Sequence, residues 1–242
     1  MRFGYAIAAL LLVGCGSAES RTSITVSAAA SLTGAFTEIA DEFAAAHPDV
    51  DVALNFGSSG QLAAQIGDGA PADVVAFADT AAMDTLAKAG LVDESDVFAT
   101  NELTIVTKPG NPSGVTGLAD LKGVVSLCVE TAPCGRFAAQ VLAAAGVTIP
   151  EGSVTRGADV KATLAAVAEG DAVAAIVYVT DARAAAGRGD EVEIPAASNT
   201  VAESPSAGVR RSAYAAAARG FRHAAGREGG GEALRTAGFG AP

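Results

Sequence analysis

The hydrophobic positions of the chain switch repeatedly between the period of a strand and that of a helix. Residues 24–30 form a short apolar run typical of a strand, and residues 33–46 place Phe36, Ile39 and Phe43 on one helical face before His47-Pro48 ends it. The same alternation predicts strands over 50–56, 72–78, 103–107, 124–129 and 173–179, and helices over 61–68, 81–89, 118–121, 136–145, 160–169 and 181–186. This order indicates an α/β fold with parallel sheets, whose ligands lie beyond the carboxyl ends of the strands.

The C-terminal region follows this pattern less clearly. Residues 203–212 contain no apolar run long enough for a strand. Residues 213–225 favour a helix, and residues 232–238 favour a final helical turn that leads to Phe239. The pattern alone therefore predicts no strand between residues 203 and 212.

Length and charge limit the classes of function. A chain of 242 residues is long enough for one compact unit or for two lobes of about a hundred residues each. It carries 16 Lys and Arg against 27 Asp and Glu, and the net charge of −11 argues against a nucleic acid partner. An acidic protein can still bind an anion if the site consists of neutral donors.

The first residues have the features of a secretory signal. Arg2 precedes an apolar run from Phe3 to Val13, which is shorter than the roughly 20 residues that a membrane-spanning helix needs. The run ends in Leu-Val-Gly-Cys, which resembles the lipobox of bacterial lipoproteins, and Cys15 would then carry the lipid. An ordinary signal cut near Ala18 is the alternative. Residues 1–22 are thus expected to be signal and tether, and the rest of the chain to work outside the cytoplasm.

The other two cysteines, Cys128 and Cys134, lie in the segment LCVETAPCG. An even pair outside the cytoplasm favours a disulfide, whose small loop would be worth about 2 kcal/mol. A metal site would need further ligands, and His47 and His223 lie far away in the sequence without ligand spacing. Free thiols are the remaining alternative.

Two turns from a strand into a helix are rich in serine: SAAASLTG contains Ser31, and FGSSGQL contains Ser58 and Ser59. The first N–H groups of a helix have no partner within it and lie at the positive end of its dipole, so they attract anions. A serine hydroxyl adds a donor there, and the glycines of the second turn let the backbone approach a ligand. Each serine taken alone is more typical of an N-cap.

Five segments in the same order resemble the periplasmic molybdate-binding proteins of ABC importers over nearly the whole chain after the signal. They read ITVSAAASLTGAFTEIADEF, FGSSGQLAAQIGDGAPADVVAFAD, APCGRFAAQVLAAAG, GADVKATLAAVAEGDAVAAIVYVTDA and TAGFG. The resemblance implies an α/β, two-lobed periplasmic-binding-protein fold of type II-like topology, with parallel-rich sheets flanked by helices and with hinge crossover strands. We expect lobe 1 to comprise residues 23–102 and 207–242, and lobe 2 to comprise residues 103–206.

The resemblance also implies how the oxyanion is bound. It assigns the donors to Ser31, Ser59, Cys134, Val160 and Tyr178, with Ser58 as an accessory donor. The serines and the tyrosine would donate through hydroxyls, and Cys134 and Val160 through backbone N–H groups. Molybdenum would be present only inside the oxyanion, without direct protein ligands, and no cofactor is expected. Without the resemblance, Tyr178 would be interpreted as a buried core ring whose hydroxyl has found any partner.

A ring of donors without a carboxylate discriminates among anions. Molybdate, tungstate and sulfate carry no proton near neutral pH, whereas phosphate keeps one and needs an acceptor for it. Cavity size must choose between sulfate and the larger molybdate, and only the resemblance favours molybdate, with tungstate as a second ligand and sulfate or thiosulfate as alternatives. Arg136 and Lys161 follow two of the donors, and we expect both to be solvated charges at helix starts.

Donors on both sides of a hinge would make the anion favour the closed form, because only then are all of them engaged. We therefore expect a monomeric receptor, anchored to the membrane by its lipid, that presents the anion to the permease of an ABC transporter. A serine hydrolase that uses Ser31 or Ser59 would need a base, and the sequence offers neither a nearby histidine nor a G-x-S-x-G motif. An enzyme is thus not expected, and a purely structural lipoprotein is the third alternative.

One segment departs from the family pattern. After SNTVAES the family continues with an aromatic residue, a proline and a strongly apolar strand, whereas this chain reads PSAGVRRS, and GFRHAAGREGGG stands where a helix is expected. A shifted reading frame over residues 204–231 that is later restored would produce such a change, and so would divergence. In either case this sequence predicts a weakened hinge strand.

Overall fold

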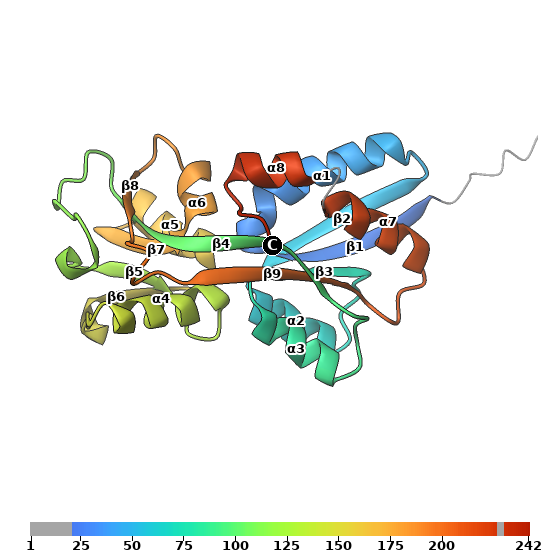
Figure 1. Ribbon diagram of the computed structural model, residues 1–242, viewed down its shortest axis with the longest axis horizontal. Coiled ribbons are helices and arrows are strands. Elements are labelled where there is room, and N and C mark those ends of the chain that lie inside the picture. Colours follow the sequence, from blue (N-terminus) through green and yellow to red (C-terminus); the bar gives the residue numbers. More distant parts are fainter. Residues whose placement is uncertain (1–20, 227–229) are drawn as a thin grey trace, which may run out of the picture.

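The computed structural model describes residues 21–226 and 230–242 (Figure 1). Cys15 and nearly all of the predicted signal and tether lie outside the described residues. Within the described ranges, no helix is long and apolar enough to cross a membrane.

The described strands form one nine-stranded sheet in the order β2-β1-β3-β9-β4-β7-β5-β6, with β8 paired to β4. The strands are β1 Thr22–Ala29, β2 Val50–Gly57, β3 Val74–Ala76, β4 Asp96–Thr107, β5 Val125–Cys128, β6 Val154–Gly157, β7 Ala174–Tyr178, β8 Asp190–Glu193 and β9 Val201–Gly208. The α-helices are α1 Thr33–Ala46, α2 Ser59–Gly67, α3 Thr80–Lys88, α4 Pro133–Ala144, α5 Val160–Ala168, α6 Val179–Ala184, α7 Ala215–Ala225 and α8 Gly230–Ala237. Short 3-10 helices lie at η1 Ala30–Leu32, η2 Leu118–Asp120 and η3 Glu151–Ser153.

The elements separate into two lobes, and the long strands β4 and β9 run from one lobe into the other (Figure 1). The N-terminal lobe, as defined here, contains β1 to β3, α1 to α3 and the C-terminal helices α7 and α8. The second lobe contains β5 to β8 and α4 to α6. The predicted α/β fold with two lobes is confirmed. The predicted lobe boundaries, between 102 and 103 and between 206 and 207, fall inside β4 and β9 and stay predictions.

The sheet is parallel within each lobe, as predicted, and the strands that cross between the lobes make it mixed as a whole. Within the lobes, β1 pairs in parallel with β2 and β3, and β5 pairs in parallel with β6 and β7. Every pairing of β4 and β9 is antiparallel. These two strands carry the chain from one lobe to the other in opposite directions, which is why the centre of the sheet is antiparallel.

The prediction that residues 203–212 contain no strand is wrong. Strand β9 lies at the centre of the sheet, between β3 and β4, and its residues from Ser204 to Ala207 are buried. It is specified by main-chain pairing more than by bulky side chains: even Pro205, which lacks an N–H, accepts a bond of 2.9 Å from the Phe77 N–H. Small residues suffice here because the neighbouring strands and helices provide the apolar cover.

Helix α7 packs on the N-terminal lobe through aromatic contacts. Phe221 of α7 is fully buried, and its ring centroid lies 6.0 Å from that of Phe36 and 5.5 Å from that of Phe43, both on α1. Such edge-to-face pairs stabilise a core beyond the area that they bury. The atypical segment thus contributes most of β9 and the helix α7, which buries Ala218, Phe221 and Ala225 against the lobe.

Candidate functional site

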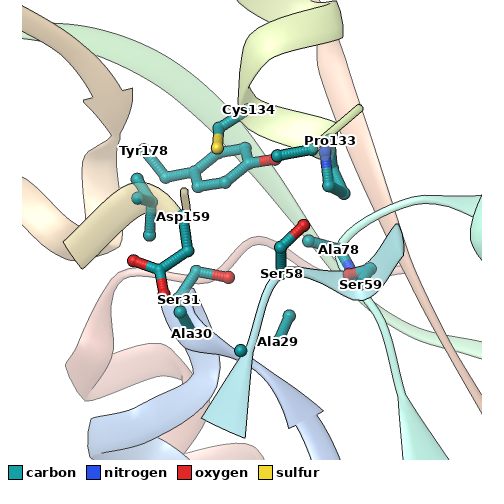
Figure 2. Close-up of a pocket in the computed structure, with 13 residues that line it drawn as sticks. Ala29, Ala30, Ser31, Ser58, Ser59, Ala78, Pro133, Cys134, Asp159 and Tyr178 are labelled. Atoms are coloured by element: carbon teal, nitrogen blue, oxygen red, sulfur yellow. The ribbon is translucent and has the colours of Figure 1, made fainter. Parts of the chain in front are cut away.

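The carboxyl ends of strands from both lobes meet at one cavity (Figure 2). In the N-terminal lobe the segments that follow β1, β2 and β3 line it, and in the second lobe those that follow β5, β6 and β7. The cavity is small, with a volume of about 10 Å³, and the lining residues are Ala29, Ala30, Ser31, Gly57, Ser58, Ser59, Ala78, Ala132, Pro133, Cys134, Asp159, Val160 and Tyr178. This is the place where α/β sheets bind ligands.

All six candidate donors from the sequence line this cavity. Ser31, Ser58 and Ser59 come from the N-terminal lobe, and Cys134, Val160 and Tyr178 come from the second lobe. Residues more than a hundred positions apart are therefore brought together between the lobes. Their role in binding stays a prediction, which the geometry supports.

The serine side chains are available to a ligand and are not used as caps. Ser58 stands at the N-cap of α2, yet its hydroxyl makes no capping bond, and Ser31 lies within η1 and makes none either. The Ser59 hydroxyl accepts a bond of 3.0 Å from the Ala78 N–H, which leaves its own hydrogen free to be donated. Figure 2 shows the hydroxyls of Ser31 and Ser58 pointing into the space between the lobes.

Three helices begin at the cavity. The N-caps of α2, α4 and α5 are Ser58, Ala132 and Asp159, and all three line it. Cys134 is the second residue of α4 and Val160 the first of α5, so their N–H groups have no partner within their helices. Three positive dipole ends and several N–H donors therefore face one small space.

The start of α4 is fixed by a disulfide and by a glycine. Cys128, the last residue of β5, is bonded to Cys134, and their Cα atoms lie 5.7 Å apart. A Cβ on Gly135 would overlap the carbonyl oxygen of Val129, so only glycine allows the helix to begin this close to the strand. With the sulfurs joined to each other, the alternatives of free thiols and of a cysteine metal site do not apply to this structure.

Tyr178 brings a donor that has no partner in the protein. Its side chain is buried, and its hydroxyl has no hydrogen-bond partner among the described residues. Burial, and after it the charges of Asp79 and Asp181, raise the pKa of the hydroxyl well above its usual value, while Arg136 acts in the opposite direction. The hydroxyl therefore stays protonated at neutral pH, and the cavity offers it the place for an acceptor.

One carboxylate, which the sequence analysis did not assign to the site, also lines the cavity. Asp159 accepts a bond of 2.9 Å from the Ala162 N–H through Oδ1 and so caps α5. The segment Gly157-Ala158-Asp159 had the pattern of a helix start, which was the available signal. The five predicted main donors include no carboxylate, but the wall of the cavity does.

The cations near the site are paired, which corrects the expectation that Arg136 and Lys161 are solvated charges. Arg136 forms an ion pair with Asp79, and the Lys161 ammonium lies 2.9 Å from Oδ1 of the buried Asp181. Neither cation lines the cavity. Burial raises the pKa of Asp181, and the nearby Lys161 charge opposes that shift.

The surroundings of the two histidines do not support hydrolytic chemistry. His47 packs against Phe43 with ring centroids 4.3 Å apart, and His223 lies on α7, so neither lines the cavity. Among the described residues there is also no group of three or more His, Cys, Asp or Glu that could hold a metal ion. The donors that line the cavity suit an acceptor-rich guest.

Comparisons with known proteins agree with this geometry. The model of the family described as bacterial extracellular solute-binding protein matches residues 24–240. The molybdate-binding protein ModA of Mycobacterium tuberculosis is 39% identical over 224 residues, which cover 87% of this chain and 85% of that protein. The structure of the sulfate-binding protein SubI from Mycobacterium tuberculosis matches with a TM-score of 0.81 at 24% identity, covering 90% of this chain and 86% of that one. The periplasmic molybdate-binding protein of Azotobacter vinelandii matches with a TM-score of 0.78 at 21% identity, covering 90% and 99%.

Proposed function

The chain belongs to the bacterial extracellular solute-binding proteins, and we propose that its solute is molybdate, captured between the lobes for an ABC importer. Tungstate, which has the same shape and charge, is the expected second ligand. The relative at 39% identity is named for molybdate and is covered over most of its length, which supports this choice.

The observation that carries the proposal is the unpartnered hydroxyl of Tyr178 facing the starts of three helices. A buried hydroxyl without a partner costs free energy, about 1–3 kcal/mol, unless a ligand completes its hydrogen bond. A tetrahedral oxyanion presents acceptors in several directions at once. Each donor bond to a charged group is worth about 1.5–3 kcal/mol, so a few of them offset the desolvation of a dianion.

Sulfate is the second candidate, and the match to a sulfate-binding structure at a TM-score of 0.81 favours it. Both anions carry no proton at neutral pH and suit a donor-lined site equally well in chemical terms. They differ in size, so the affinity of each must decide. Phosphate, which keeps a proton, is expected to bind weakly.

Titration calorimetry and thermal melting of the domain from residue 21 onward, with molybdate, tungstate, sulfate and phosphate, test the proposal. We expect molybdate and tungstate to bind tightest and to raise the melting temperature most. Ser31→Ala should weaken molybdate binding by about tenfold or more, whereas Ser23→Ala on the exposed surface of β1 should leave it unchanged. Tighter binding of sulfate than of molybdate would assign the site to sulfate, and binding of none of the four anions would refute the proposal.

We also propose that the protein is anchored by lipid on Cys15 and works as a monomer beside the permease. The Leu-Val-Gly-Cys sequence at the end of the signal supports the anchor. In cells, the Cys15→Ala variant should be found in the soluble fraction, and the wild-type protein in the membrane fraction. Equal distribution of both proteins would instead favour a cleaved signal.

A further inference from the structure

An ion pair joins the two lobes beside the cavity. Asp79, the N-cap of α3, belongs to the N-terminal lobe, and Arg136, in the first turn of α4, belongs to the second lobe. Nη2 of Arg136 donates a hydrogen bond to Oδ2 of Asp79. The Asp79 side chain is almost completely buried, and that of Arg136 is 35% exposed. Because its two members belong to different lobes, a movement of the lobes apart would separate the pair.

Both members of the pair are held in place by their own lobes. Oδ1 of Asp79 accepts a bond of 3.1 Å from the Ala82 N–H and so caps α3. Nη1 of Arg136 donates a bond of 2.8 Å to the carbonyl oxygen of Thr131. The second carboxylate oxygen of Asp79 and the second amino nitrogen of Arg136 therefore point to the other lobe. Because both side chains are already held, they lose little conformational entropy when the pair forms.

The same carbonyl group lies at a close contact between the lobes. A Cβ on Gly60, in the first turn of α2, would lie 2.6 Å from the Thr131 oxygen. Glycine therefore allows α2 of the N-terminal lobe to approach the loop before α4 of the second lobe. Arg136 thus binds the Thr131 carbonyl oxygen of its own lobe and the Asp79 carboxylate of the other lobe.

The pair lies next to the binding residues without being one of them. Asp79 follows Ala78, and Arg136 lies two residues after Cys134, yet neither side chain lines the cavity. Because the two charges cancel, the pair adds little net attraction for an anion.

We propose that Asp79 and Arg136 form a latch that holds the closed lobes around the bound anion and sets the rate at which it leaves. Both are positioning residues: they favour the closed form, in which the donors of both lobes are engaged. The proposal rests on the proposed function for the identity of the anion. Breaking one member of a buried charged pair acts mainly on dissociation, so we expect anion release to become at least about tenfold faster.

The test compares Asp79→Asn, Arg136→Gln and the double variant with the wild-type domain. Asparagine is itself a good N-cap, so Asp79→Asn keeps the cap of α3 and removes only the charge. Arg136→Gln removes the charge from the other lobe. Glu151→Gln is the matched control, because it breaks an ion pair of 2.8 Å with Arg156 that lies within the second lobe.

Release of molybdate is measured by stopped-flow tyrosine fluorescence, and closure by small-angle X-ray scattering with and without molybdate. We expect each single variant to release molybdate at least about tenfold faster, the double variant to be no worse than the single ones, and the control to match the wild type. Added salt should speed release from the wild type more than from the double variant, which a purely structural role would not produce.

Release rates within twofold of the wild type in both single variants would overturn the latch. If the wild type binds none of the four anions, the proposed function fails, and the scattering of the ligand-free proteins then tests the latch alone. In that case a radius of gyration that is larger in both single variants than in the wild type supports it, and equal radii refute it.

Discussion

Tyr178→Phe separates binding from stability more sharply than any other change in this site. The substitution removes one oxygen atom from a side chain that is 2% exposed and keeps the ring that packs at the end of β7. In the ligand-free protein this oxygen has no hydrogen-bond partner among the described residues. The empty protein therefore loses no hydrogen bond, whereas the complex with an oxyanion would lose one.

The two effects have opposite signs. An unpartnered buried hydroxyl costs up to about 1–3 kcal/mol, so its removal should leave the ligand-free melting temperature unchanged or raise it. A hydroxyl bond to a charged acceptor is worth about 1.5–3 kcal/mol, which corresponds to a roughly 10- to 150-fold weaker dissociation constant. Because the pKa of this hydroxyl is raised, the wild-type affinity should not fall between pH 7 and pH 9 through its ionisation.

Calorimetric titration with molybdate and thermal melting of the empty protein measure the two effects in the same samples. Tyr214→Phe is the control, because Tyr214 is 44% exposed and precedes α7 on the surface. An affinity of the Tyr178→Phe variant within threefold of the wild type would refute the assignment of this hydroxyl as a donor. A lower melting temperature of the empty variant would show that the hydroxyl has a structural partner.

Four further changes test the surroundings of the cavity. Reducing the disulfide of Cys134 should lower the free energy of unfolding by about 2 kcal/mol in urea titrations and should weaken binding, because the first turn of α4 is then less fixed. Gly135→Ala should cost at least as much, since its Cβ would overlap a carbonyl oxygen, whereas Gly34→Ala has open space and should be neutral or stabilising in the same titration. Asp159→Asn keeps the cap of α5 and removes the carboxylate from the cavity wall, so calorimetry should show molybdate bound about fivefold tighter and phosphate still weakly. The pKa of Asp181 is raised in the folded protein, so the free energy of unfolding of the wild type falls as the pH rises from about 4 through that pKa. Asp181→Asn should therefore raise the melting temperature at pH 7, and this gain should vanish near pH 4.

The amphipathic elements could be predicted from the sequence, and the elements specified by pairing could not. The predicted helix over 33–46 coincides with α1, because its apolar face is regular and a proline follows. Strands β6 and β8 went unpredicted, since VTRG and DEVE carry no apolar run, and they are held by the ladders with β5 and β4. Strand β4 begins at Asp96, seven residues before the predicted start at 103, because its polar first half pairs with β9.

The candidate site was predictable only in part, for a physical reason. Each serine turn alone looked like an N-cap, and only the resemblance to a family assigned Ser31, Ser59 and Tyr178 to one ligand. The structure brings them to one cavity because parallel strands in each lobe end at the same edge. Contacts between the lobes, such as that of Asp79 with Arg136, join residues 57 positions apart and leave no local pattern that a sequence could show.

In a chain with a net charge of −11, a dianion needs the charges around its site to be offset. The cations that flank the cavity are paired, and the carboxylate of Asp159 is the charge that remains in its wall. Arg136 and Lys161 lie in the first turns of α4 and α5, where a free cation would oppose the helix dipole. Each is instead paired with a buried carboxylate, Asp79 or Asp181, so the pairs contribute little net field. The attraction left in the cavity then comes from helix ends and hydroxyls, which do not titrate near neutral pH. A site built in this way favours an anion of the right shape that carries no proton. A protonated anion must donate a hydrogen bond, and most of the groups that face it are themselves donors.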